Sequence, residues 1–233
     1  MKKENLLLKL SYLIFPNRCA VCNKVINYHN NYCLNCKREL RPIPNYFAQM
    51  YSNSNSFITN FDKIYYDGIC APFYHSDGSK RMVYNYKFYN RSELKHILTD
   101  CMAESFENHL KSLNIDYFCE VPTKFISVLK RGYNHTLLLS KLTSEKCNVK
   151  RLSLLKLIGK KSVQHKLTAI ERAKNVKGVY SFNTKFNIKG KNIVIIDDIF
   201  STGSTINECS KVLKKNGANK VYSLTATINK LND

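Results

Sequence analysis

The stretch Asn192-Ile-Val-Ile-Ile-Asp-Asp-Ile-Phe-Ser-Thr-Gly-Ser-Thr205 decides the fold that this sequence predicts. Four consecutive β-branched residues, Ile193 to Ile196, are typical of a strand buried on both faces of a parallel sheet. Two acids, Asp197 and Asp198, are expected at the C-terminal end of that strand, followed by a loop over 201–205 that opens an amphipathic helix. Ligands of open parallel sheets bind outside the C-terminal ends of strands, so this stretch predicts a ligand site.

The loop and the acid pair suit different parts of one ligand. A hydroxyl-rich, glycine-containing loop at a helix N-terminus favours a phosphate monoester, because backbone N–H groups and the positive end of the helix dipole meet there. The acids would repel that phosphate, but they can accept hydrogen bonds from two adjacent sugar hydroxyls. A 5′-phosphate beside a ribose diol fits both halves. The residues expected to bind it are Asp197, Asp198, Ser201, Thr202, Gly203, Ser204 and Thr205.

This order of strand, acid pair, loop and helix resembles the phosphoribosyl pyrophosphate (PRPP) signature of type I phosphoribosyltransferases. The resemblance implies an α/β fold, a parallel sheet flanked by helices. The sequence contains neither G-x-x-x-x-G-K-[ST] nor G-x-G-x-x-G, which excludes a P-loop and a dinucleotide fingerprint. The alternative is an ordinary buried strand that happens to end in two acids before a capped helix.

Cys19-Ala-Val-Cys22 and Cys33-Leu-Asn-Cys36 predict a small metal-binding module near the N-terminus. Two such pairs close a tetrahedral all-sulfur site, and the intervening polar loop has no core of its own, so zinc would supply most of its folding free energy. Four thiolates leave no open coordination position, which indicates a structural zinc site and not a catalytic one. An iron–sulfur cluster is the alternative, because ligand geometry alone does not separate the two.

Composition predicts an ordinary globular protein with an unusual charge. The 233 residues are 44% hydrophobic and 23% charged, enough for one α/β domain plus a small module. The net charge of +20 favours a polyanionic partner, although an AT-rich coding sequence would also raise the lysine content. Fourteen Lys and Arg against two Glu make residues 124–177 the first place to look for such a partner. The five cysteines outside the module are scattered singly, which indicates a reducing, cytoplasmic location.

We expect four segments along the chain: an amphipathic helix over 1–15, the zinc module over 16–42, a linker over 43–62 and a phosphoribosyltransferase-like domain over 63–233. The first segment has the length of a signal-peptide core but no small-residue cleavage site, so we interpret it as a packing helix or a peripheral membrane contact. No transmembrane segment is expected.

The second domain should contain one parallel sheet. We expect strands within 64–75, 117–121, 152–158, 179–182, 193–196 and 221–228, and helices over 78–88, 91–111 and 135–146. A basic loop after the strand 117–121 would lie beside the acid pair, where the forked guanidinium of Arg131 is suited to a second phosphate group. A solvated surface charge is the alternative for Arg131.

Across nearly its full length the chain resembles the ComF family of competence proteins, which couple a four-cysteine zinc module to a phosphoribosyltransferase-like domain. The matching blocks are Cys19–Cys36, Val121-Pro122 with Arg131-Gly132-Tyr133-Asn134, Gln164–Leu167 with Arg172 and Asn175, and Ile193–Thr205. Two positions depart from the family pattern: His135 stands where Gln is usual, and Lys166 where Gly is usual. The resemblance implies PRPP binding, a bacterial cytoplasmic protein, and a connection with natural transformation and single-stranded DNA after uptake.

Two functions follow as expectations. In the first, an enzyme transfers phosphoribosyl groups with Mg²⁺: the catalytic pair Asp197 and Asp198 holds the diol, and Arg131 with Mg²⁺ holds the departing pyrophosphate. No residue set in the sequence defines an acceptor base pocket or a general base. In the second, the same site binds PRPP without turnover, in a DNA-handling module whose partners include single-stranded DNA and proteins of the uptake machinery. Basic residues would track the strand, and aromatics such as Tyr84, Tyr86, Phe88 and Tyr133 could stack on its bases, although such aromatics are more often core residues.

Overall fold

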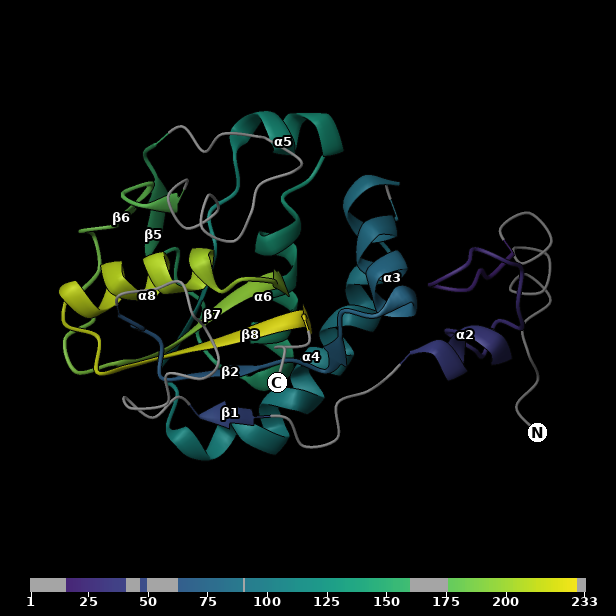
Figure 1. The fold of residues 1–233 in the computed structure, drawn as a ribbon, viewed down its shortest axis with the longest axis horizontal. Helices are drawn as coiled ribbons and strands as arrows, with labels where there is room; N and C mark the ends of the chain where they lie inside the picture. The colour runs from purple at the N-terminus through teal and green to yellow at the C-terminus, as the bar shows by residue number, and fades with distance from the viewer. Residues whose placement is uncertain (1–15, 41–46, 50–62, 90, 160–175, 230–233) are drawn as a thin grey trace.

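The computed structural model shows a central sheet with helices on both faces and a small cysteine-containing module at one end (Figure 1). It describes residues 16–40, 47–49, 63–89, 91–159 and 176–229. The helix expected over 1–15, most of the expected linker and the block Gln164–Asn175 lie outside the described residues, so those predictions stay predictions.

The main sheet has the strand order β1-β2-β8-β7-β4, and β3 also pairs with β8. All of its pairs are parallel except β1 with β2. The long strands β7 and β8 form its centre, which confirms the strand that the run Ile193 to Ile196 predicts. The strands are β1 (Phe47–Gln49), β2 (Gly68–Cys70), β3 (Phe73–Tyr74), β4 (Tyr117–Glu120), β7 (Asn192–Phe200) and β8 (Lys220–Ile228).

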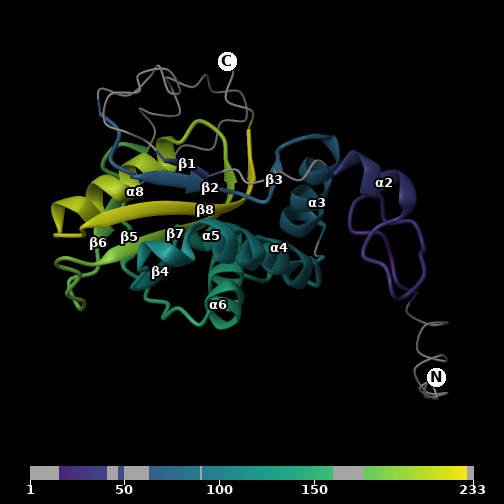
Figure 2. The same ribbon diagram turned by 90° about the horizontal axis from the view of Figure 1, so that it is seen from below.

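Alternation along β7 divides the core in two. Ile193 and Ile195 pack with α8 (Ser204–Lys215), whereas Val194 and Ile196 pack with the helices of the opposite face. Those helices are α3 (Asp77–Phe88), α4 (Leu94–His109), followed by the 3₁₀ turn η1 (Lys111–Leu113), and α6 (His135–Cys147). Figure 2 shows α4 and α6 on one side of the sheet and α8 on the other. A strand buried on both faces reads as a continuous apolar run, which is why its pattern was legible in the sequence.

Two expectations about the elements are wrong. The segments near 155 and 180 do not complete the main sheet: β5 (Leu155–Leu157) and β6 (Tyr180–Phe182) pair antiparallel with each other as a separate two-stranded sheet. The chain leaves the main sheet earlier, because Arg151 makes only one bridge to Phe118 of the edge strand β4. The expected loop before Arg131 is instead a short helix, α5 (Phe125–Arg131), which buries none of its residues and ends at Gly132 with φ +76°.

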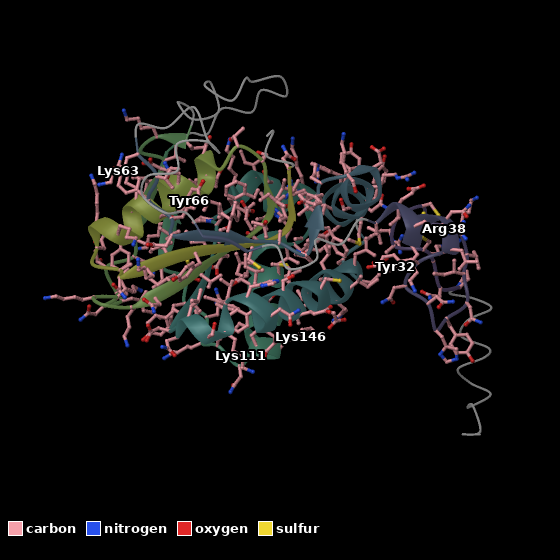
Figure 3. All side chains as sticks on the ribbon, turned by 60° about the horizontal axis from the view of Figure 1, so that its bottom comes forward. Tyr32, Arg38, Lys63, Tyr66, Lys111 and Lys146 are labelled. Atoms are coloured by element: carbon pink, nitrogen blue, oxygen red, sulfur yellow. The ribbon has the colours of Figure 1, made fainter. Side chains whose placement is uncertain are left out.

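The cysteine module is attached to the body of the protein through α3. The Asn85 amide donates to Val21 O at 3.0 Å, and Arg91 Nη1 donates to Cys19 O at 3.1 Å. Tyr32 lies where the module meets the body (Figure 3) and its hydroxyl contacts Met82 Sδ at 3.9 Å. The module and α3 therefore share one core.

Among the described residues, no helix has the length and apolar character needed to cross a bilayer.

Candidate functional site

A cavity of about 640 Å³ lies at the C-terminal ends of β7 and β4. Its wall brings together residues that are far apart in sequence, from the acid pair, the 201–205 loop, α5, α3 and the start of α6. The lining includes His75, Lys87, Thr123, Lys124, Arg131, His135, Asp197, Asp198, Ser201 and Thr205. The cavity lies at the sheet edge where the sequence predicts a ligand site.

The hydroxyl loop turns sharply into α8 through Gly203. Gly203 has φ +74° and is the N-cap of the helix, a left-handed conformation that favours glycine. A Cβ at this position would lie 2.8 Å from Phe200 Cζ, so the close approach also requires glycine. Thr202, Gly203 and Ser204 line a second hollow of about 20 Å³ that shares Ser201 and Thr205 with the main cavity. The loop thus forms a small cradle at the positive end of α8, next to the larger cavity.

The two acids do not face the same way. The sequence suggested that the strand ends at the two acids. In the structure β7 continues through both of them to Phe200, so Asp197 and Asp198 lie within the strand. Pleating sends successive side chains to opposite faces. Asp198 lies on the face of α3 and α6 and is only 3% exposed. Asp197 is half-buried and lies on the α8 side. Burial is the main cause of the raised pKa of Tyr180, and the negative charge of Asp197 contributes to it. Both carboxylates still reach the cavity wall.

Asp198 is surrounded by basic groups. Its Oδ2 atom lies 2.5 Å from Lys87 Nζ and 3.1 Å from His135 Nε2. Burial and, after it, the positive charges of Lys87 and Arg131 together lower the pKa of His135 to about 2, so the imidazole is neutral at physiological pH. His135 is held in place by α6, whose first turn is capped by Asn134 and tied to Val121 O through the Thr136 hydroxyl.

Arg131 reaches the cavity as predicted, but from the last turn of α5. Its Nη1 atom lies 2.8 Å from His135 Nδ1, and its guanidinium stacks over Phe88 at 5.1 Å from the ring centroid. The side chain lines the cavity and has two side-chain partners, so the structure favours the cavity over a solvated surface position for Arg131. Its role toward a phosphate stays a prediction.

The sequence analysis did not predict Lys87 and His75 as site residues, and it did not predict the contacts of His135. Lys87 is an isolated lysine in the last turn of α3, and its partner Asp198 follows more than a hundred residues later. His75 Nδ1 lies 3.0 Å from Thr227 Oγ1, and burial with nearby Lys80 and Lys87 lowers its pKa. The only available signal was the departure from the family pattern at His135.

The four predicted metal ligands meet in one cluster. The sulfur atoms of Cys19, Cys22, Cys33 and Cys36 all lie within 4.8 Å of one another, and none is in a disulfide. Burial raises the pKa of the Cys19 thiol, but backbone N–H groups of Cys22, Cys33 and Val21 outweigh that effect and bring the pKa down to about 7. Four thiols converging on one point, with donors that favour a thiolate, fit a tetrahedral structural zinc.

The comparisons with known proteins agree with both parts of the chain. The phosphoribosyl transferase domain family matches residues 111–230, just over half of the chain, and the double zinc ribbon domain family matches residues 10–52. Competence protein F of Haemophilus influenzae is 27% identical over 209 residues, 87% of this chain and 86% of that protein. DNA utilization protein YhgH of Escherichia coli (strain K12) is 26% identical over 146 residues, 59% of this chain and 61% of that protein.

Solved structures give a more distant likeness. Adenine phosphoribosyltransferase from Saccharomyces cerevisiae is 14% identical with a TM-score of 0.41, over 85% of this chain and 96% of that one, and nothing about activity follows from it. The phosphoribosyl transferase domain follows the zinc ribbon in the sequence. The chain therefore belongs to the phosphoribosyl transferase domain family and has the organisation of a ComF-type protein.

Proposed function

We propose that the cavity binds PRPP, a ribose with a 5′-phosphate and a pyrophosphate at C1′. The observation that supports this most is the lining of one cavity by three kinds of group: the loop residues Ser201 and Thr205, the acid Asp197 and the cation Arg131. These groups match a phosphate, a diol and a second phosphate group in turn. A nucleoside or a free sugar would leave at least one of the charged groups without a counterpart.

The residues then take distinct roles. The 201–205 loop and the N-terminus of α8 bind the 5′-phosphate, the acid pair accepts hydrogen bonds from the ribose hydroxyls, and Arg131 neutralises the pyrophosphate. Mg²⁺ prefers carboxylate and phosphate oxygens, so it would enter with the pyrophosphate and stabilise it as a leaving group. Transfer to an acceptor requires a base pocket, and none of the described lining residues identifies one.

The test is isothermal titration of the zinc-loaded protein with PRPP in Mg²⁺, followed by assay of pyrophosphate release with each nucleobase in turn. We expect saturable binding. Release stimulated by one base would make the protein a transferase and name its acceptor, whereas binding without release would make it a PRPP-responsive module. Absence of binding would contradict the proposal.

The second candidate, a single-stranded-DNA-binding module that responds to PRPP, is favoured by an exposed aromatic cluster on α3. Tyr84, Phe88 and Tyr89, the last directly after the end of α3, are 51%, 55% and 64% exposed, and the ring of Tyr84 contacts the other two rings. Arg131 stacks on Phe88, which joins this cluster to the cavity. Aromatic faces beside cations are the usual platform for unpaired bases. The names of the two relatives, which mention competence and DNA utilization, agree with this candidate, and contacts with uptake proteins and a cytoplasmic location remain predictions.

This candidate is tested by fluorescence anisotropy with a labelled oligonucleotide. Tyr84→Ala with Phe88→Ala should weaken binding by about tenfold or more, since base stacking contributes about 1–3 kcal/mol per base. Tyr28→Ala, a partly exposed tyrosine of the cysteine module, is the matched control and should bind like wild type. Equal binding by all three proteins would rule out the aromatic cluster as the DNA surface.

A further inference from the structure

Lys87 lines the cavity although no sequence motif marks it. It stands in the last turn of α3, with its ammonium 2.5 Å from Asp198 Oδ2 and its side chain 18% exposed. An ammonium offers three N–H donors, and its place in the wall puts its positive charge beside any anion that enters. Lys87 is therefore positioned as a ligand residue as well as a counter-ion.

Arg131 is joined to the same carboxylate through His135. A guanidinium has only donors, so His135 Nδ1 must accept from Arg131 Nη1 at 2.8 Å. The ring proton is then on Nε2, which lies 3.1 Å from Asp198 Oδ2. The chain runs from Arg131 through the uncharged ring to Asp198, and Lys87 approaches the same oxygen from another helix.

We propose that Lys87 and Arg131 together form the pyrophosphate subsite of the cavity, and that His135 is the positioning residue that joins the Arg131 guanidinium to Asp198. Two cations from different helices, α3 and α5, are held toward one buried carboxylate. The charged lining of the cavity consists of three cations, with Lys124 the third, against Asp197 and Asp198, which leaves one net positive charge for an anion. An anion that carries more charge than a phosphate monoester gains most from such a pair.

This inference uses the proposed function only to name the ligand, and pyrophosphate alone can test it. Lys87→Gln keeps a donor for Asp198 but removes the charge. We expect this variant to bind pyrophosphate and PRPP about tenfold more weakly than wild type, and ribose 5-phosphate less than about twofold more weakly. The reason is that one charge-assisted contact is lost, at the pyrophosphate end only. Lys80→Gln, an exposed lysine of the same helix, is the matched control and should bind all three ligands like wild type.

The role of His135 is tested by a pair of variants. A glutamine side chain can also accept on one side and donate on the other, so His135→Gln should retain pyrophosphate affinity to within about threefold, whereas His135→Leu, with neither group, should lose about tenfold. Zinc content and thermal unfolding confirm that each variant is folded. Equal affinities in the two variants would overturn the positioning role.

A footprint on the wild-type protein avoids dependence on any variant. Reductive methylation followed by mass spectrometry should show Lys87 protected by pyrophosphate and Lys80 unprotected. Protection by pyrophosphate, with no binding of PRPP, would keep the subsite and reject the proposed function. Binding of PRPP with no effect of Lys87→Gln and no protection of Lys87 would keep the function and reject the subsite.

Discussion

Asp198 is a buried carboxylate whose charge the fold compensates with Lys87 and the Nε2–H of His135. Removing one partner of a buried ion pair costs more than the pair contributes, since the other charge is left in a poorly solvated place. His135 lies against the acid without adding charge, because its neutral ring places Nε2 at 3.1 Å from Asp198 Oδ2 while Nδ1 accepts from Arg131. The arrangement lets His135 act as an amide side chain would, with an acceptor atom on one side of the ring and an N–H on the other.

The neutral state of His135 predicts a pH dependence of stability. Its pKa is lowered to about 2 in the folded protein, against about 6.5 in an unfolded chain. Between these values the unfolded chain binds a proton that the folded chain excludes, so the free energy of unfolding is unaffected above about pH 6.5 and falls as the pH drops below it. From about pH 7.5 to 5.5, wild type should lose about 1 kcal/mol more than His135→Gln in urea unfolding. Equal losses would show that the ring is protonated in the folded state.

Single residues were predicted from the sequence wherever their neighbours in the chain define the site. Asp197, Asp198 and the hydroxyl loop were found because strand, acids and helix start are contiguous. Lys87 could not be found, because its pairing with Asp198 depends on how α3 packs over the end of β7. The opposite directions of the two acids could be foreseen from strand alternation only if the strand was known to continue through them.

The turn from β7 into α8 depends on one backbone conformation. Gly203 combines φ +74° with a neighbour, Phe200, that leaves no room for a Cβ. Gly190 has nearly the same φ, +73°, but nothing within 4 Å of the Cβ position. The two glycines therefore separate the cost of the conformation from the cost of the close approach.

Gly203→Ala should lower the free energy of unfolding by about 2 kcal/mol or more, and Gly190→Ala by about 1 kcal/mol, since the left-handed conformation alone costs roughly 1–2 kcal/mol. Only Gly203→Ala should also weaken binding of ribose 5-phosphate, because it displaces the loop. Chemical denaturation and calorimetry measure the two effects. Matching losses of ligand affinity in both variants would contradict a specific role for this turn.

Elements were predicted well where they bury an apolar pattern and poorly where they do not. β7 reads as a continuous apolar run and α8 has a strong apolar stripe, and both were placed to within a few residues. α5 buries no residue, because its apolar side chains Phe125, Ile126 and Leu129 are exposed, and a run of seven residues is too short to show a helical period. Only Gly132 after two basic residues hinted at a helix end. The separate sheet of β5 and β6 was missed because a short apolar segment does not reveal which strand it pairs with.

At the scale of the whole molecule, the cysteine module is coupled to the cavity through α3. One side of α3 binds the module through Asn85, and its last turn carries Lys87 into the site. Gly78 lies so near the end of the module that a Cβ there would be 3.3 Å from the Glu39 backbone. The metal site and the ligand site thus depend on the same helix, which the linear sequence did not indicate.

Loss of zinc should therefore loosen α3. Cys22→Ser removes one ligand, and we expect loss of bound zinc and faster amide hydrogen exchange across 77–88, with little change in the central strands β7 and β8. Cys101→Ser, a cysteine outside the metal cluster, is the control and should keep its zinc. Unchanged exchange in α3 of the zinc-free variant would show that the module and the site are independent.

The central claim is that the cavity holds a phosphorylated ribose between the loop and Asp197. The most direct measurement is isothermal titration of PRPP with Mg²⁺ into wild type, Asp197→Asn and Asp100→Asn, the last an exposed acid on α4 with a side chain 62% exposed. The account predicts that wild type and Asp100→Asn bind alike and that Asp197→Asn binds about tenfold more weakly or worse, since a carboxylate acceptor for the sugar is lost. Equal affinity in all three proteins would contradict it.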